Sequence, residues 1–412
     1  MDRRVVVTGM GAVTPFGVGV DPFWDGLIEG RSGIRTITLF DTSQHEVRIG
    51  GEIPSFDPEK HLDRKAIKRL DRYAQLALVA TAEAVTMSGL RPEQEDPAMM
   101  AVVYGSGIGG MNELEEQFGR LAAKGPSKVS AFTIPKLMVN AASGNISIAY
   151  GAKGNSMAVS SACASATHAM GEAAAHIRRG DADIVFTGGS EAALTPLALA
   201  AFASMKALST RNDDPASASR PFDRDRDGFV LAEGAGALIF EELEHAKKRG
   251  APIFAEVVGF SATSDADHIT QPSETGEGAA RAMALAIKSA RVNPDQVDYI
   301  NAHGTSTPLG DTAETAAIKR VFGDAARELV VSSTKSAVGH SLGASGGVEI
   351  IAAIQAARHA VVPPTINLHN PGDGCDLDYC PNTARDRKIR VAMSNSFGFG
   401  GHNACIVIRR WE

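Results

Sequence analysis

VSSACASA, residues 159–166, and VSSTKSAV, residues 331–338, share one pattern within this chain. Each stretch follows apolar residues and precedes a run of small residues that is typical of a helix. The repeat indicates a duplicated half, in which one strand–helix unit carries Cys163 and the other carries Lys335. We place the boundary near KKRGAPI, residues 247–253, so that the expected units are residues 1–250 and 251–412.

Strand-like and helix-like runs alternate around these two stretches, which predicts an α/β fold built in layers. The expected strands are VVVTG (5–9), MAVVYG (100–105), DIVFTGG (183–189) and DYINAHG (298–304). The expected helices cover residues 74–87, 163–179, 275–290 and 343–358.

Length and composition indicate a globular chain with a sizeable core. The chain has 412 residues, of which 44% are hydrophobic and 22% charged, enough for one large or two ordinary domains. Its longest apolar stretch, residues 192–205, is interrupted by Thr195 and Pro196, so we expect no membrane span. No secretory signal pattern opens the sequence, and four cysteines are too few for a disulfide framework. We therefore expect a cytoplasmic protein with reduced thiols.

Charge is distributed unevenly along the chain. The net charge of -7 and the pI near 5.9 argue against nucleic-acid binding. However, KHLDRKAIKRLDR (60–72) holds six Lys or Arg against two Asp, and residues 117–171 contain no acidic residue. This pattern fits an anionic partner, and it fits a solvated helix face equally well.

Several familiar motifs lack a residue that their chemistry needs. GSGIGG (105–110) follows a strand but lacks the acidic residue that a dinucleotide site places about 20 positions later. DRDRDG (223–228) begins like a calcium loop, but glycine stands at its twelfth position. There is no Walker-type phosphate loop and no zinc spacing, so we predict neither a metal nor a bound cofactor.

Cys163 is the best nucleophile candidate. A thiol at the start of a helix gains from the positive end of the helix dipole, which predicts that the thiolate is favoured. A small buried core cysteine is the alternative. His303, in NAHGTSTPLGD, and His340, in SSTKSAVGH, lie among small residues and would suit nucleophilic catalysis beside Cys163.

These contexts together resemble the elongating β-ketoacyl-acyl carrier protein synthases of the thiolase superfamily, and within them the synthase II group. RPFDRDRDGFVLAEGAG (220–236), PPTINL (363–368) and NSFGFGGHN (395–403) are also similar to that family, so the resemblance covers essentially the whole chain. It implies a thiolase-like fold with two mixed-sheet halves in α/β/α/β/α layers, and a homodimer.

The resemblance also implies a decarboxylative Claisen condensation. Cys163 would carry the acyl chain, while His303 and His340 would stabilise the enolate left by malonyl-acyl carrier protein. The backbone N–H groups of Cys163 and Phe399 would hold the tetrahedral oxygen. Lys335 would be buried and paired with Glu349, where a lysine is otherwise normally a solvated surface charge.

Further residues follow from the resemblance. The substrates would arrive on the phosphopantetheine arm of acyl carrier protein. The arm would be bound by Thr270, Thr305 and Thr307, and Ile108 would form the floor of the acyl pocket; simple turn capping is the alternative for the threonines. Carrier-protein docking is expected at Lys65, Lys68, Arg69, Lys128 and Lys206.

The chain departs from the family pattern near the expected pocket, in ACASAT, SAFTIP (130–135) and HITQP. Fatty acid elongation is the main interpretation, and a ketosynthase of a specialised polyketide or modified-lipid pathway is the alternative. A thiolase would use a second cysteine near the C-terminus, but Cys405 lies in a strand-like stretch that favours core packing. A chain-length factor would lack Cys163.

Overall fold

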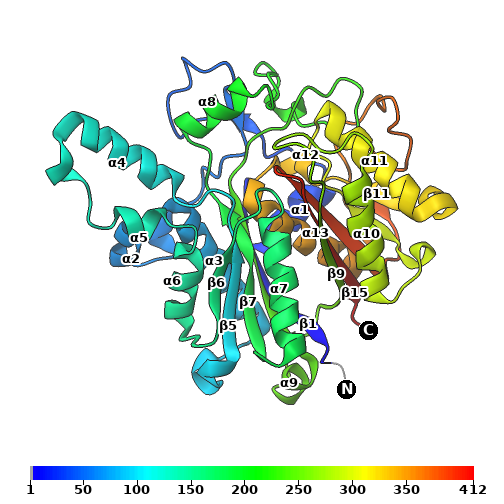
Figure 1. The fold of residues 1–412 in the computed structure, drawn as a ribbon, viewed down its shortest axis with the longest axis horizontal. Helices are drawn as coiled ribbons and strands as arrows, with labels where there is room; N and C mark the ends of the chain where they lie inside the picture. The colour runs from blue at the N-terminus through cyan, green and yellow to red at the C-terminus, as the bar shows by residue number, and fades with distance from the viewer. Residues whose placement is uncertain (1–2) are drawn as a thin grey trace.

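Ten strands form the main sheet of the computed structural model, which describes residues 3–412 (Figure 1). An eleventh strand, the short β2 (Gly17–Val18), pairs with β1 and lies outside the order in which the other ten strands follow one another. The first half contributes β1 (Val5–Thr14), β5 (Met100–Gly105), β6 (Ser156–Val159), β7 (Ile184–Glu191) and β8 (Gly234–Glu242). The second half contributes β9 (Ala255–Ser264), β10 (Tyr299–Asn301), β11 (Val330–Ser332), β14 (Val391–Gly398) and β15 (His402–Arg410).

The two halves have the same strand order and the same strand directions. The first half runs β6-β5-β7-β8-β1 and the second runs β11-β10-β14-β15-β9. In each half two parallel pairings are followed by two antiparallel ones. The duplication predicted from the VSS repeat is confirmed, since Cys163 follows β6 and Lys335 follows β11, which occupy equivalent places.

The expected α/β/α/β/α layering is confirmed as well. Helices α7 (Ser165–Arg179) and α13 (Ser345–His359) lie between the halves, where each contacts strands of both. Helices α3 (Arg72–Ser88) and α6 (Ala141–Tyr150) cover the first half, and α10 (Glu277–Ala290) and α11 (Pro308–Phe322) the second. The strands β1 and β9 pair only over Val5–Val7 and Ala255–Val257, which links the two halves.

The remaining elements are short or peripheral. The helices are α1 (Val20–Ile28), α2 (Arg64–Arg69), α4 (Met111–Lys124), α5 (Thr133–Leu137), α8 (Pro196–Ser204), α9 (Leu243–Lys248) and α12 (Lys335–Val338). The paired two-residue strands are β3 (Arg35–Thr36) with β4 (Ile49–Gly50), and β12 (Val361–Val362) with β13 (Arg385–Asp386). The proposed boundary at residue 250 falls in the connection between α9 and β9.

Close backbone packing explains two glycines of β1. A Cβ at Gly11 would lie 1.9 Å from the carbonyl oxygen of Ala80 in α3, and one at Gly9 would lie 2.0 Å from that of Ala84. Any side chain at either position would push α3 off the sheet. The largest apolar cluster contains residues of both halves, from Val5 to Ile408, so the halves share one core. Within residues 3–412, no helix is both long and apolar enough to cross a bilayer.

Candidate active site

The nucleophile candidate, Cys163, lies in a strained turn between β6 and α7. Ala162 adopts φ 50, a left-handed conformation that costs a non-glycine residue about 1–2 kcal/mol. Cys163 is the next residue and lies two positions before Ser165, where α7 begins. Its side chain is buried beside apolar residues that include Ile108 and Leu342. The turn therefore presents the sulfur at the wall of a pocket.

His340 is in direct contact with this sulfur. Its Nε2 lies 3.0 Å from Cys163 Sγ, and its Nδ1 lies 3.0 Å from Ser345 Oγ. Burial and the charge of Lys335 hold the pKa of His340 well below its usual value, so the ring is neutral. When Ser345 donates to Nδ1, Nε2 carries the hydrogen and can donate to sulfur or to a substrate oxygen.

His303 stands at the end of β10, beside His340. The two rings meet edge to face with centroids 5.5 Å apart. The backbone N–H groups of His303 and Gly304 donate to the carboxylate of Glu314 at 2.9 and 2.8 Å. Burial, then Lys335 and His340, hold the pKa of His303 well below its usual value. Two neutral imidazoles therefore face the same space.

Lys335 lies behind the histidines as a buried cation. It is 1% exposed, and its Nζ donates to Glu349 of α13. The surface-charge alternative for this lysine is thus wrong, and the predicted pairing with Glu349 is confirmed. Its charge reaches Cys163, His303 and His340 through a low-dielectric interior.

The Cys163 thiol is less acidic than the sequence predicts. Burial raises the pKa of Cys163 to about 12, although the Lys335 charge and the Phe399 N–H act to lower it. The prediction that the thiolate is favoured is wrong for the resting site, because burial disfavours the charged sulfur. The thiol is protonated until a substrate reacts with it.

The last residue of β14, Gly398, packs directly on the turn of the nucleophile. A Cβ at Gly398 would lie 2.7 Å from the carbonyl oxygen of Ser161 and 3.1 Å from the Cys163 nitrogen. Only glycine therefore allows this approach. The Phe399 N–H points at the Cys163 sulfur, and the Phe399 ring lies 6.5 Å from that of Phe202, centroid to centroid.

A cavity of about 500 Å³ joins these groups. Its lining includes Cys163, His303, His340, Phe399, Ile108, Thr270, Thr305, Thr307 and Lys206, so the chain brings nine of the predicted residues together. Lys335 and Glu349 lie behind the wall. Thr305 Oγ1 is 3.1 Å from Thr307 Oγ1, and Thr307 makes no side-chain cap to α11. This last observation disfavours the capping alternative for Thr307.

The other predicted docking residues lie outside the cavity. Lys65, Lys68 and Arg69 are exposed on α2, and Lys128 is exposed between α4 and α5. The Arg69 guanidinium lies 5.4 Å from the centre of the Phe132 ring, which connects α2 to the segment that precedes α5. Lys206, at the cavity, is exposed and 3.5 Å from Glu46.

Sequence reasoning missed two buried carboxylates that shape the site. Glu314 holds the loop of His303, and Glu191 accepts from Ser106 Oγ and from the backbone N–H groups of Gly107, Ile108 and Gly109. The GSGIGG motif thus wraps an internal carboxylate rather than a phosphate. Glu191 acts on residues more than 80 positions away, and Glu314 acts across the loop between β10 and α11, so neither matches a short sequence motif.

Four buried side-chain oxygens could act as ligands of a small cation. Asn301 Oδ1, Glu349 Oε2, Ser394 Oγ and Asn395 Oδ1 are buried and have no hydrogen-bond partner. Oxygen ligands of this kind suit hard cations. Among residues 3–412, no group of three or more His, Cys, Asp or Glu side chains is arranged to hold a metal.

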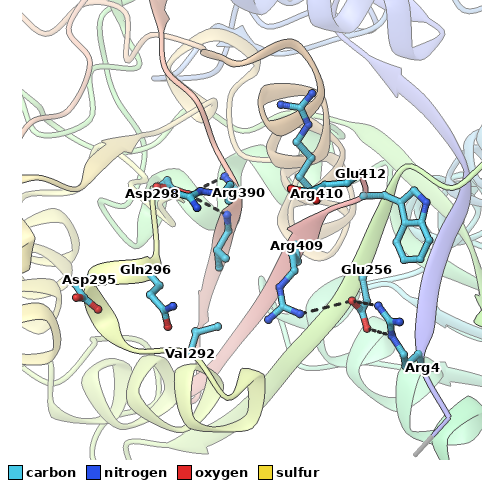
Figure 2. Close-up of a pocket in the computed structure, with 12 residues that line it drawn as sticks. Arg4, Glu256, Val292, Asp295, Gln296, Asp298, Arg390, Arg409, Arg410 and Glu412 are labelled. Carbon is cyan, nitrogen blue, oxygen red and sulfur yellow. Dashed lines mark hydrogen bonds and ion pairs between the residues drawn. The ribbon is translucent and has the colours of Figure 1, made fainter.

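A second cavity, of about 510 Å³, lies at the ends of β1 and β15 (Figure 2). Its lining contains no cysteine or histidine, and two of its arginines pair with one of its carboxylates. Arg4 donates to both oxygens of Glu256 at 2.7 and 2.8 Å, and Arg409 lies 3.8 Å from the same carboxylate. The chemistry therefore belongs to the cavity of Cys163.

Comparison with known proteins agrees with this geometry. The model "Beta-ketoacyl synthase, N-terminal domain" matches residues 2–246, and "Beta-ketoacyl synthase, C-terminal domain" matches residues 254–369. The chain belongs to the β-ketoacyl synthase family. It is a condensing enzyme with the thiolase-like fold.

Relatives in sequence and in structure cover the whole β-ketoacyl synthase chain. A 3-oxoacyl-(acyl-carrier-protein) synthase 2 from Synechocystis sp. is 50% identical over 100% of this chain and 99% of its own. The protein of that name from Staphylococcus aureus is 48% identical over 100% and 99%. A β-ketoacyl synthase from Burkholderia phymatum has a TM-score of 0.93 at 38% identity, with both chains fully covered.

A further solved structure holds an acyl-carrier protein bound to its ketosynthase from a type II polyketide synthase. It matches with a TM-score of 0.92 at 36% identity, and both chains are fully covered. The complex with a carrier protein belongs to that solved structure.

Proposed function

We propose that this β-ketoacyl synthase is an acyltransferase that condenses malonyl-acyl carrier protein with a cysteine-bound acyl chain, giving β-ketoacyl-acyl carrier protein in fatty acid elongation. One observation carries the proposal: Cys163 Sγ lies 3.0 Å from a neutral His340, at the wall of a cavity that also holds His303. The curated relatives, at 48–50% identity, are synthase 2 proteins, which favours fatty acid elongation over a specialised pathway.

The first half-reaction loads the acyl chain. Cys163 attacks the carbonyl carbon of the acyl thioester, the carbon–sulfur bond to pantetheine breaks, and the thiol proton passes to the leaving sulfur. Negative charge on Cys163 Sγ during the attack is stabilised by His340 Nε2–H, the Phe399 N–H and the Lys335 charge. These groups offset the burial that keeps the thiol protonated at rest.

The second half-reaction forms the carbon–carbon bond. The malonyl carboxylate leaves as carbon dioxide, and its bonding electrons pass to an enolate whose oxygen accepts from His303 and His340. The carbanion attacks the acyl carbon, and the N–H groups of Cys163 and Phe399 hold the tetrahedral oxygen. Collapse releases the β-ketoacyl product and leaves Cys163 as a thiolate, which takes up a proton.

Substrate delivery involves the rest of the cavity and the basic surface. Thr270, Thr305 and Thr307 bind the pantetheine arm, and Ile108 forms the floor of the acyl pocket. All four residues line the cavity, which supports this assignment. Acyl carrier protein docks on the basic residues of α2 and on Lys128 and Lys206. The enzyme works in the cytoplasm as a homodimer, with its substrates on the carrier protein and no bound cofactor.

Mass spectrometry tests the nucleophile. Incubation with an acyl-acyl carrier protein should add one acyl group to the peptide of Cys163, and Cys163→Ala should abolish condensation. Cys375, Cys380 and Cys405 are internal controls, since all three are buried free thiols. Acylation confined to these three cysteines would contradict the assignment.

A further inference from the structure

His168 of α7 lies one helical turn from the nucleophile and takes no part in the proposed reaction. Its Nδ1 lies 2.8 Å from Ser161 Oγ and 3.2 Å from the carbonyl oxygen of Ala164. These two residues flank the turn of Cys163 on either side. The ring is therefore attached to the nucleophile turn without touching the sulfur.

The turn needs such attachments because its backbone is strained. Ala162 has φ 50, and conformations of this kind persist only where surrounding structure holds them. Ser165 supplies one clamp, since its Oγ donates to the Ala162 carbonyl at 2.6 Å and accepts from the Ser161 N–H at 2.9 Å. His168 supplies a second side-chain contact to Ser161, through the hydroxyl.

The surroundings of His168 fix the ring in place. It meets the rings of Phe260 in β9 and His402 in β15 edge-on, each with centroids 6.3 Å away. His402 directly follows the turn that carries Phe399. Burial, together with the nearby His402, lowers the pKa of His168, so that the ring is neutral. The nucleophile turn is thereby braced against strands of the second half.

We propose that His168 is a positioning residue that holds Ser161 and, through it, the orientation of Cys163 toward His340 and the Phe399 N–H. This inference deepens the proposed function and rests on Cys163 as the nucleophile. Misplacement of a reacting group by about 1 Å can cost about 100-fold in rate, so a lost brace should be visible in the kinetics.

Three variants at position 168 separate positioning from simple packing. Asn places an amide near the position of Nδ1, Gln places one near the position of Nε2, and Leu fills space without any hydrogen bond. We expect His168→Leu and His168→Gln to lower kcat about 10-fold or more, and His168→Asn to stay within about 3-fold of wild type. His176→Leu, two turns further along α7 with side-chain contacts to Asn155 and Asp181, is the matched control and should be neutral.

Two readouts report on the variants. One is steady-state condensation, in which kcat should fall while KM for malonyl-acyl carrier protein stays at its wild-type value. The other is alkylation of Cys163 by iodoacetamide, which needs neither carrier protein nor condensation. If condensation were absent even in wild type, the proposed function would fail, whereas the alkylation series would still test His168.

A double-mutant cycle with Ser161→Ala tests whether His168 acts on Cys163 through the Ser161 hydroxyl. If His168 acts through the Ser161 hydroxyl, His168→Leu/Ser161→Ala should be no slower than the slower single variant. Alkylation by His168→Leu at the wild-type rate would overturn the proposal. So would an Asn variant as slow as Leu, or additive effects in the cycle.

Discussion

Each reactive side chain of this site has its charge state set by burial. The Cys163 thiol and both histidines are neutral at rest, and Lys335 is the buried cation that lies near all three. Neutral imidazoles can stabilise the enolate, because a neutral ring still carries one N–H group, which can donate to the enolate oxygen. His340 contacts the sulfur and also donates to the enolate, whereas His303 donates to the enolate alone. The two histidines can therefore be distinguished by experiment.

His303→Ala and His340→Ala should each lower malonyl decarboxylation about 100-fold or more, the scale of losing one oxyanion donor. Acylation of Cys163 should fall more in His340→Ala, since only His340 lies 3.0 Å from the sulfur. Carbon dioxide release measures the first effect and mass spectrometry the second.

His369→Ala, at an exposed histidine outside the cavity, is the matched control for these variants. Wild-type decarboxylation in either active-site variant would refute the role given to that histidine.

At the scale of the element, α2 is a six-residue helix whose exposed face is almost entirely basic. Asp63 caps it by accepting from the Lys65 and Ala66 N–H groups at 2.8 and 2.9 Å. Exposed charges of this kind mainly steer the encounter with a partner, and salt screens them. If α2 is a docking surface, its charges should affect KM for the carrier protein in a salt-dependent way. If α2 is only a solvated helix face, they should not.

Lys65→Glu/Lys68→Glu should raise KM for acyl carrier protein, more at low salt than at high, and leave turnover of a short acyl-pantetheine mimic unchanged. Lys68 is preferred to Arg69 here because Arg69 also packs on Phe132. Steady-state kinetics over a range of salt concentrations measure the effect.

Lys247→Glu/Lys248→Glu on α9 makes the same change in net charge away from α2 and serves as the control (Figure 1). If the α2 variant kept the wild-type KM and salt dependence, α2 would be a solvated face only.

At the scale of the whole molecule, one flank carries apolar side chains that the chain itself leaves uncovered. Phe118 of α4 is 69% exposed and Ile148 of α6 is 81% exposed. Among the described strands, β6 pairs with β5 alone, so its other edge is open. Helix α4 projects from the body beside α5 (Figure 1), and such a surface favours burial against a second copy.

We expect a mass of twice the 43.1 kDa of one chain by analytical ultracentrifugation, as a homodimer requires. Phe118→Asp/Ile148→Asp should shift the enzyme toward the monomer, because each carboxylate would be buried without a partner. Leu285→Asp, at a residue of α10 that is 46% exposed, should leave the mass unchanged. A wild-type enzyme that sediments as a monomer would contradict the homodimer.

The alternation of strands and helices and the duplicated halves could be predicted from the sequence, because the local spacing of apolar, small and turn residues encodes them. The VSS repeat, for example, marks two strands, β6 and β11, that occupy equivalent places in the two halves. The resemblance to a known family identified the nucleophile. Three properties could be seen only once the chain was folded. His340 meets Cys163, which is 177 positions away, Glu314 and Glu191 hold their loops, and burial keeps the thiol protonated. Such properties depend on which distant segments pack together and on how much water that packing excludes, and neither is encoded in the spacing of neighbouring residues.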